Sequence, residues 1–415
     1  MARSEHQPVI IGAGVAGLVA ALHLEEAGHA PILLDAADHV GGRVGTDEEQ
    51  GFLLDHGFQV LLTAYQEARR YLDFDQLDLR KFEPGALIFA DGKAFPVSDP
   101  IRKPSALPTM ALSPVGSPAD KFRMWKLTRQ LKAMDRSACF ELPPQSTLAY
   151  LQAYGFSDRV IERFFRPFFG GIFLERELET DASMFRFVFK MFSEGHAAIP
   201  NRGMAAIPRQ LRARLKQTDL RLSQKVLQVA GSEIRLEGGE KMTFRQLILA
   251  TEPSRILPNL HGQGPAYRTT TLLYFKAAAS PLHRPHIALV AEPGSPVNNW
   301  CVLTDVAPGY GPGGEALLSV SLREGSLGRE EEAPRRVAEA LQNLRGMGGV
   351  ELEFLRRYDI PRALPVLSDM VFDMPPSQTR LTDNIFLAGD HLLNPSLDAA
   401  MRSGRNAAMA LLGGY

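Results

Sequence analysis

The hydrophobic pattern at the start of the chain predicts a strand, a tight turn and a helix. Residues 9–11 form a short apolar run that is typical of a buried strand, and apolar residues recur with helical spacing over residues 18–24. A second apolar strand is expected over residues 30–34. This order of elements predicts an α/β fold with a Rossmann-like, doubly wound domain at the beginning of the chain.

Segments with similar patterns follow along the rest of the chain. We expect strands at residues 220–229, 234–236, 247–251 and 384–388, and helices at 207–215 and 398–412. Six prolines between residues 96 and 118 predict a loop without regular structure. The chain therefore returns to strand and helix patterns after a long and different middle part.

The segment 120–134 has helical periodicity and an uneven charge. The apolar residues are expected to lie broadly on one side and Lys and Arg side chains on the other; the apolar residues are Phe122, Trp125, Leu127, Leu131 and Met134. A solvated helix that faces the core is the simpler interpretation. A basic amphipathic helix that lies on an anionic membrane is the alternative.

Composition narrows the class of protein. The 415 residues are 45% hydrophobic and 22% charged, which excludes collagen-like, disordered and disulfide-scaffold proteins. The net charge of −1 gives no general electrostatic reason to bind nucleic acid. The two cysteines, Cys139 and Cys301, are expected to be buried thiols, so a cytoplasmic location is predicted, with membrane association as the alternative. No spacing of ligands indicates a metal site.

The turn after the first strand carries the spacing of a dinucleotide site. Gly12 allows a sharp turn, Gly14 allows the backbone to approach a pyrophosphate, and Gly17, which follows Ala16, allows helix and strand to pack closely. The acid Asp35 ends the second strand, where it can accept hydrogen bonds from an adenosine ribose. A membrane span or signal peptide over residues 7–24 is the less favoured interpretation, because the glycines interrupt the run.

This glycine pattern alone occurs in both NAD-binding and FAD-binding proteins, and the residues that follow it distinguish the two cofactors. Gly41, Gly42 and Arg43 follow Asp35, and Gly57 ends a later Asp-x-Gly turn. These residues closely resemble the N-terminus of the superfamily of FAD-dependent amine oxidases, protoporphyrinogen oxidases and phytoene desaturases. The resemblance implies that the cofactor is FAD.

The family resemblance extends to the middle and the end of the chain. Gly389 and Asp390 followed by a helix with Ala399 and Ala400 resemble its closing motif, in which the acid bonds the ribityl chain and the helix N-terminus faces the flavin. Val226 lies where the family holds adenine with a backbone group, although a strand without ligand contact remains the alternative.

The family also assembles its FAD domain from separated segments of the chain. The resemblance implies FAD-binding segments at residues 1–80, 201–265 and 381–415. Residues 81–200 and 266–380 would then form an interleaved α+β substrate domain.

The predicted substrate segments carry little catalytic chemistry. Eleven phenylalanines cluster between residues 140 and 192, which indicates an apolar substrate chamber, an aromatic core, or both. His56, His391 and Arg402 are candidate catalytic residues, with a histidine bonded to a nearby carbonyl and an arginine on a helix surface as the alternatives.

Resemblance to the amine oxidase branch is weaker, because Thr270 falls where many of its members place a lysine. We therefore expect hydride transfer from a hydrophobic polyene or tetrapyrrole-like substrate to FAD, with oxygen, a quinone or another acceptor reoxidising the flavin. An oxidase of small amines is one alternative. A non-catalytic FAD protein that binds a membrane surface or a partner is the other.

Overall fold

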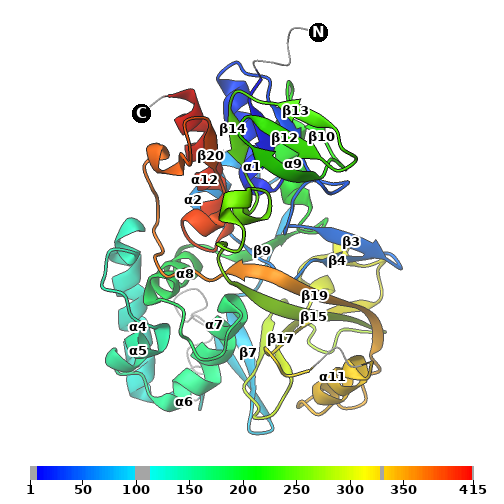
Figure 1. Cartoon of the computed structure of the whole chain (residues 1–415). Helices are drawn as coiled ribbons and strands as arrows, with labels where there is room; N and C mark the ends of the chain where they lie inside the picture. The colour runs from blue at the N-terminus through cyan, green and yellow to red at the C-terminus, as the bar shows by residue number, and fades with distance from the viewer. Residues whose placement is uncertain (1–6, 99–112, 328–330, 414–415) are drawn as a thin grey trace.

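A computed structural model of the chain describes residues 7–98, 113–327 and 331–413. Figure 1 shows a smaller upper part, which contains both ends of the described chain, and a larger lower part with a long sheet beside a group of helices. The two long strands β15 (Tyr267–Ala277) and β19 (Glu353–Pro365) lie on the side of the lower part that faces the upper part.

A parallel sheet of five strands forms the centre of the upper part. Its order is β10-β2-β1-β14-β20, and each neighbouring pair is parallel. The strands are β1 (Val9–Ile11), β2 (Ile32–Leu34), β10 (Asp219–Arg221), β14 (Leu247–Leu249) and β20 (Ile385–Leu387). The three inner strands are apolar and buried on both faces, as a covered parallel sheet requires.

Helices and a small antiparallel sheet cover this sheet. The helices are α1 (Val15–Glu26), α2 (Gln66–Tyr71), α9 (Ala206–Arg214) and α12 (Leu397–Leu412). The small sheet contains β11 (Val226–Ala230), β12 (Glu233–Leu236) and β13 (Lys241–Thr243). The single strand expected over residues 220–229 is therefore wrong. Ser223 has a left-handed backbone conformation with a φ of +55°, and the chain turns there from one sheet into the other.

The lower part is built on a mixed sheet of seven strands in the order β19-β15-β18-β17-β16-β7-β8. Only β16 and β7 are parallel neighbours. The strands are β7 (Gly85–Ala90), β8 (Lys93–Ser98), β15 (Tyr267–Ala277), β16 (Ile287–Val290), β17 (Val297–Val302), β18 (Ala316–Leu322) and β19 (Glu353–Pro365). Pro96, expected in a loop, lies in β8, where an edge strand tolerates a residue that cannot donate a backbone hydrogen bond.

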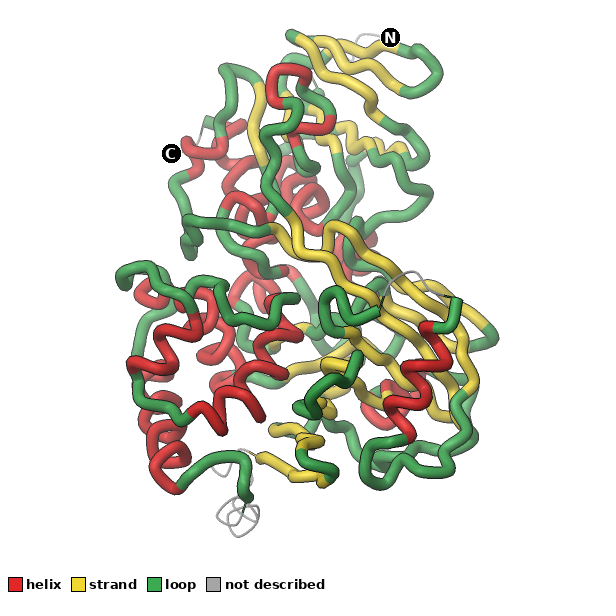
Figure 2. Tube along the Cα trace, turned by 60° about the horizontal axis from the view of Figure 1, so that its bottom comes forward, coloured by secondary structure: helices red, strands yellow, loops and turns green. Residues whose placement is uncertain are grey.

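Helices lie on one side of the seven-stranded sheet as a group, as the red and yellow tubes of Figure 2 show. They are α4 (Pro118–Ala133), α5 (Thr147–Ala153), α6 (Asp158–Val160), α7 (Arg166–Phe173) and α8 (Ala182–Glu194). The short helix α10 (Leu303–Val306) follows β17, and α11 (Ala333–Gln342) packs on the sheet through Val337 and Leu341. The expected loop at residues 99–112 lies outside the described residues.

Two small sheets connect the upper and lower parts. One pairs β3 (Thr46–Glu49) with β4 (Phe52–Asp55), and the other contains β5 (Leu61–Leu62), β6 (Leu79–Lys81) and β9 (Ala197–Pro200). Asp55, at the end of β4, accepts hydrogen bonds from the Thr46 hydroxyl and the Tyr310 hydroxyl, both at 2.6 Å, and from the Met204 amide at 2.9 Å. Burial raises the pKa of Asp55 although these hydrogen bonds oppose the shift. One buried carboxyl group thus joins three distant segments directly beside His56 and Gly57.

Candidate functional site

The turn between β1 and α1 contains three glycines with different surroundings. Gly12 has a φ of +108°, and a Cβ there would lie 2.7 Å from the Ala250 carbonyl oxygen. A Cβ at Gly17 would lie 1.9 Å from the Gly12 carbonyl oxygen. A Cβ at Gly14 would meet no described atom within 4 Å, and no side chain caps the N-terminus of α1. Packing explains Gly12 and Gly17, whereas the open space at Gly14 suits an anion at the helix N-terminus.

Asp35 lies at the end of β2 beside this turn. Its carboxylate accepts hydrogen bonds from the amides of Ala13 at 2.6 Å and Ala37 at 2.8 Å. The Gln224 amide donates to the Asp35 carbonyl at 2.7 Å, which brings the start of β11 and Val226 to this edge of the sheet. Asp35 and Val226 therefore flank the same end of the predicted cofactor site.

A second glycine loop lies against the first. The Gly41 amide donates to the Ala13 carbonyl at 2.9 Å, and a Cβ at Gly42 would lie 3.5 Å from the Gly14 Cα. Gly41 and Gly42 have φ values of +123° and +59°, a conformation that favours glycine. The two loops together form a concave backbone surface at the N-terminus of α1.

An ion pair joins this surface to the end of the chain. Arg43 Nη2 lies 2.5 Å from Asp390 Oδ1, and Asp390 is only 6% exposed. The negative charge of Asp390 raises the pKa of Arg43 against the effect of burial. The pair holds the loop after β2 next to the loop after β20, so the predicted pyrophosphate and ribityl positions become neighbours.

The loop after β20 leads into the tightly packed helix α12. Gly389 has a φ of +149°, and its amide donates to the Ser403 hydroxyl at 2.8 Å. The Ser396 hydroxyl caps α12 by accepting from the amide of Ala399, while Ala400 lies one residue further into the first turn. A Cβ at Gly404 would lie 2.1 Å from the Ala16 carbonyl oxygen, which shows how closely α12 approaches α1.

A cavity of about 490 Å³ extends from these loops into the lower part. Gly42, Arg43, His56, Gly57 and Pro395 line it at the loops. Apolar side chains from the segment around β5, from the helices α7 and α8 and from the seven-stranded sheet line the rest of it. They include Phe58, Val60, Leu62, Phe168, Ile172, Leu174, Met184, Val188, Phe192, Ile287, Leu289 and Ile360. The cavity volume is typical of a small-molecule site.

The cluster of phenylalanines serves mainly as core and partly as cavity wall. Phe165, Phe169 and Phe185 are fully buried and pack ring against ring. Phe168 and Phe192 are in contact with each other, with ring centroids 5.2 Å apart, and both line the cavity. The aromatic segment therefore forms a core whose inner edge faces the cavity.

Titratable groups at the cavity wall have partners. His56 Nε2 lies 2.9 Å from Asp47 Oδ1, and the Tyr358 hydroxyl donates to Asp47 Oδ2 at 2.8 Å. Burial raises the pKa of Asp47, but the hydrogen bonds from His56 and Tyr358 outweigh burial and lower it. Burial raises the pKa of Tyr358. The expected carbonyl partner of His56 is thus replaced by a carboxylate.

His391 does not line the cavity, and its ring is held differently from that of His56. Its Nε2 is buried and has no hydrogen-bond partner among the residues that the structure describes. Burial lowers the pKa of His391, and the charge of Arg43 adds to this shift while Asp390 opposes it. A buried nitrogen without a protein partner beside Arg43 and Asp390 fits a neighbouring polar ligand.

Arg402 lies away from the cavity and is not a surface residue. It is 3% exposed and forms ion pairs with Asp398 at 3.1 Å and Glu67 at 3.5 Å. Its guanidinium lies 4.0 Å from the ring centroid of Phe372. The interpretation of Arg402 as a helix-surface residue is therefore wrong, because the residue joins α12 to α2 inside the protein. Its role as a candidate catalytic residue stays a prediction.

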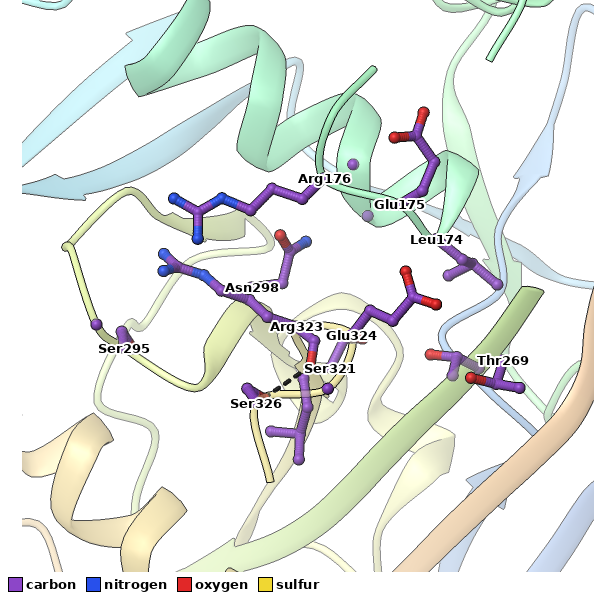
Figure 3. A pocket seen from close by; sticks show the side chains of 16 residues that line it. Leu174, Glu175, Arg176, Thr269, Ser295, Asn298, Ser321, Arg323, Glu324 and Ser326 are labelled. Carbon is purple, nitrogen blue, oxygen red and sulfur yellow. Dashed lines mark hydrogen bonds between the residues drawn. The ribbon is translucent and has the colours of Figure 1, made fainter. Parts of the chain in front are cut away.

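A second, smaller cavity of about 270 Å³ adjoins the first through Gly171, Leu174, Thr270 and Ser321, which line both. Figure 3 shows the guanidinium groups of Arg176 and Arg323 side by side at one end. Burial and the charge of Arg176 lower the pKa of Arg323 to about 10. This end of the cavity is suited to an anionic group.

Some cavity residues gave no signal in the sequence. Asn299, Ser321 and Pro395 line the larger cavity but belong to no recognisable motif. Thr270, singled out only because it occupies an expected lysine position, lines both cavities. The lining residues, all within the described ranges, include no lysine.

The part of the chain that the structure describes contains neither a metal-binding group of side chains nor a helix that could cross a membrane. Over residues 7–98, 113–327 and 331–413, no three His, Cys, Asp or Glu side chains are grouped to hold a metal ion. In the same ranges, no helix has the length and apolarity that crossing a membrane requires. Cys139 and Cys301 are free and buried, as predicted.

Comparison with known proteins gives matches over short and long ranges. A family model described as flavin containing amine oxidoreductase matches residues 15–412. An L-amino-acid oxidase of Bungarus fasciatus is 43% identical over 76 residues, which are 18% of this chain and 15% of that protein. The match thus spans about 15% of the length of that curated relative.

Two solved structures resemble nearly the whole chain. An oxidoreductase from Methanosarcina mazei has a TM-score of 0.72 at 15% identity and covers 98% of this chain and 100% of its own. A putative protoporphyrinogen oxidase from Exiguobacterium sp. 255-15 has a TM-score of 0.70 at 19% identity. The match covers 98% of this chain and 99% of that protein chain. At these identities the likeness concerns the fold, and it agrees with the predicted Rossmann-like α/β class.

Proposed function

Because the chain belongs to the flavin containing amine oxidoreductases, with FAD as cofactor, we propose that it dehydrogenates a hydrophobic small molecule. Bound FAD would supply the acceptor for a hydride from a C–H bond of the substrate, and the second hydrogen would leave as a proton to the solvent. A polyene or a tetrapyrrole-like molecule is the substrate class that we favour. The observation that carries this proposal is an apolar cavity that starts at the glycine loops.

Residues of the chain supply binding and orientation. Gly14, at the open N-terminus of α1, would leave room for the pyrophosphate, and Asp35 would accept from the adenosine ribose. Asp390 would bond the ribityl chain, and its ion pair with Arg43 fixes the position of the carboxylate. Val226 is proposed to hold adenine through its backbone.

The apolar wall would exclude water from the reacting bond and select an apolar substrate. Phe168, Val188 and Phe192 contribute from α7 and α8, and Ile287 and Leu289 from β16. Exclusion of water strengthens the electrostatic interactions within the site. His56 is bonded to Asp47, so we assign it to positioning the cavity wall at Gly57 rather than to proton transfer.

Oxidation of a small amine is the alternative, and the short similarity to an L-amino-acid oxidase favours it. It would place a basic amine in the larger cavity near Thr270. The apolar lining and the absence of lysine among the described lining residues favour the first proposal. A non-catalytic FAD protein would bind the cofactor, but neither hydrophobic substrates nor small amines would reduce its flavin.

Anaerobic titration of the purified, FAD-loaded protein tests the proposal. Loss of the visible flavin absorbance is expected with carotenoid precursors or porphyrinogens and not with a panel of small amines. Reduction by amines alone would overturn the proposal and support the amine oxidase alternative. Failure of every compound, with the flavin still reducible by dithionite, would support the non-catalytic alternative.

A further inference from the structure

Helix α4 has two faces of different chemistry. Leu127 and Leu131 are completely buried against the other helices. Phe122 is 63% exposed and Trp125 is 46% exposed. The expectation that Phe122 and Trp125 share one side of the helix with Leu127 and Leu131 is therefore wrong. Two large aromatic side chains instead lie on the solvent face of the helix.

The exposed aromatic side chains form a defined pair. The rings of Phe122 and Trp125 are stacked, with centroids 5.7 Å apart and planes at 30°. The guanidinium of Arg129 lies 5.8 Å from the Trp125 ring centroid. These positions are three and four residues apart, so they follow one stripe along the helix.

Positive charge surrounds the aromatic pair. Lys126, Arg129 and Lys132 are exposed, and within the described part of the chain none of them has an acidic partner. Asp120 is the one acid in α4, and it is 2% exposed. Its carboxylate is used at the helix N-terminus, where it accepts from the amide and hydroxyl of Ser117. The solvent face of α4 is thus cationic and aromatic.

The helix is held firmly, so this face is a fixed surface. The Lys190 ammonium of α8 donates to the carbonyls of Leu131 and Lys132, both at 3.0 Å, at the C-terminal end of α4. The helix α8 also provides Met184, Val188 and Phe192 of the larger cavity. Figure 1 shows α4 at the outer edge of the lower part, next to α5. One helix layer therefore separates this face from the apolar cavity.

We propose that the solvent face of α4, defined by Phe122, Trp125, Lys126, Arg129 and Lys132, docks the protein on an anionic lipid bilayer. Aromatic rings partition into the interfacial region of a bilayer, and Lys and Arg are attracted to anionic headgroups. Charge complementarity selects anionic over neutral lipids. The contact is peripheral and does not depend on the proposed oxidation, because its parts are all on the outer surface.

Vesicle sedimentation with the FAD-loaded protein is the first test. Binding to phosphatidylcholine vesicles that contain phosphatidylglycerol should be at least about tenfold tighter than to phosphatidylcholine alone, and high salt should weaken it. The double variant Phe122→Ser/Trp125→Ser and the triple variant Lys126→Glu/Arg129→Glu/Lys132→Glu should each lose about tenfold or more in affinity. Phe354→Ser is the matched control, because Phe354 is 40% exposed on β19.

Tryptophan fluorescence provides a second readout on the same face. The chain has two tryptophans, and Trp300 is fully buried with no hydrogen-bond partner for its indole nitrogen among the described residues. Trp300→Phe therefore leaves Trp125 as the single emitter without removing a hydrogen bond. Brominated lipids in anionic vesicles should quench this emission, and the maximum should move to shorter wavelength.

Either of two results would overturn the proposal. One is failure of the wild-type protein to bind anionic vesicles. This result would also be expected if the partner of this face were an acidic protein rather than a bilayer. The other is vesicle binding without a change in Trp125 emission, which would place the contact elsewhere. Flavin reduction is measured separately, so a failure here and a failure of the proposed oxidation are distinguishable.

Discussion

The upper part and the lower part of this protein build their surfaces in different ways. Around the five-stranded sheet the candidate site consists of backbone held by glycines, such as Gly12, Gly14 and Gly42. In the lower part the cavity wall consists of side chains from α7, α8 and the seven-stranded sheet. A side chain added to the backbone surface at Gly14 would occupy space that we propose for the cofactor, whereas a side-chain wall changes shape with each substitution. Variants in the two parts should therefore fail in different ways.

The largest effect is expected at Gly14. Gly14→Leu should weaken FAD binding by about a hundredfold. The leucine side chain would occupy the space through which the pyrophosphate approaches the backbone, and the resulting clash would cost about 3 kcal/mol of binding free energy. The free protein should remain folded, because a Cβ there meets no described atom within 4 Å and the φ is −68°. Bound flavin per protein and thermal unfolding measure the two quantities.

Gly348→Leu is the control for this variant, because a Cβ at Gly348 also meets open space. Full flavin occupancy in Gly14→Leu would contradict the cofactor assignment and would remove the contrast between the two parts.

A smaller and different effect is expected at Val188, which is 2% exposed and lines the larger cavity. Val188→Phe should lower kcat/KM for a bulky apolar substrate about tenfold, because the added ring fills the cavity at a cost of about 1–3 kcal/mol. Flavin occupancy should stay that of the wild type. Val188→Ala keeps the cavity open and serves as the matched variant, and loss of FAD from Val188→Phe would show that the two parts are not separable.

The paired arginines of the smaller cavity should give a modest effect. An apolar acid should inhibit more strongly than its methyl ester, and Arg323→Met should reduce that difference about threefold, as expected for a partly exposed ion pair. Arg335→Met, on the exposed side of α11, is the control. Equal inhibition by acid and ester in the wild-type protein would contradict an anion site at Arg176 and Arg323.

The last effect is on stability rather than on binding or catalysis, and it concerns the pH dependence of the upper part. Burial lowers the pKa of His391 below its ordinary value of 6.5, so the unfolded chain takes up a proton there before the folded protein does. The free energy of unfolding should therefore fall as the pH decreases below 6.5, by at most about 1.4 kcal/mol per pH unit from this group.

Urea unfolding at two pH values, one above and one below 6.5, measures this slope for the wild-type protein. His391→Gln should reduce the slope, whereas the exposed His261→Gln is the surface control. An unchanged slope in His391→Gln would show that burial of this ring does not favour its neutral form.

The contrast between a backbone surface and a side-chain wall also explains which features the sequence could predict. The first strand, turn and helix were predicted well, because the glycine spacing, the apolar strands and Asp35 are all local in the sequence. The cavity could not be assembled in advance, since Asn299, Ser321 and Pro395 become neighbours only through tertiary packing. A wall of this kind has no spacing that a single sequence can display.

Two predictions of side-chain orientation in helices are wrong, each for its own reason. In α4 the buried stripe is set by Leu127 and Leu131, and Phe122 and Trp125 lie across from it. In α12 the polar residue Arg402 faces inward, because Asp398 and Glu67 provide buried carboxylates. At about 3.6 residues per turn, the spacing in α4 by itself places Phe122 and Trp125 opposite Leu127 and Leu131. The inward orientation of Arg402 depends on Asp398 of the same helix and also on Glu67, which comes from a distant part of the chain.

The order of strands in the five-stranded sheet has a consequence for biosynthesis. In the sheet, β1 lies between β2 and β14, and β20 lies on the far side of β14. In the sequence, almost the whole chain separates β1 from β20. At the usual rate of translation, about 5–20 residues per second, the N-terminal glycine turn would emerge from the ribosome tens of seconds before β20 and α12 exist. The nascent chain must keep an apolar helix, α1, covered during that interval, until Gly404 can pack on Ala16. A cofactor-competent site is thus a late event in synthesis, and chaperone dependence is expected to be set by this delay.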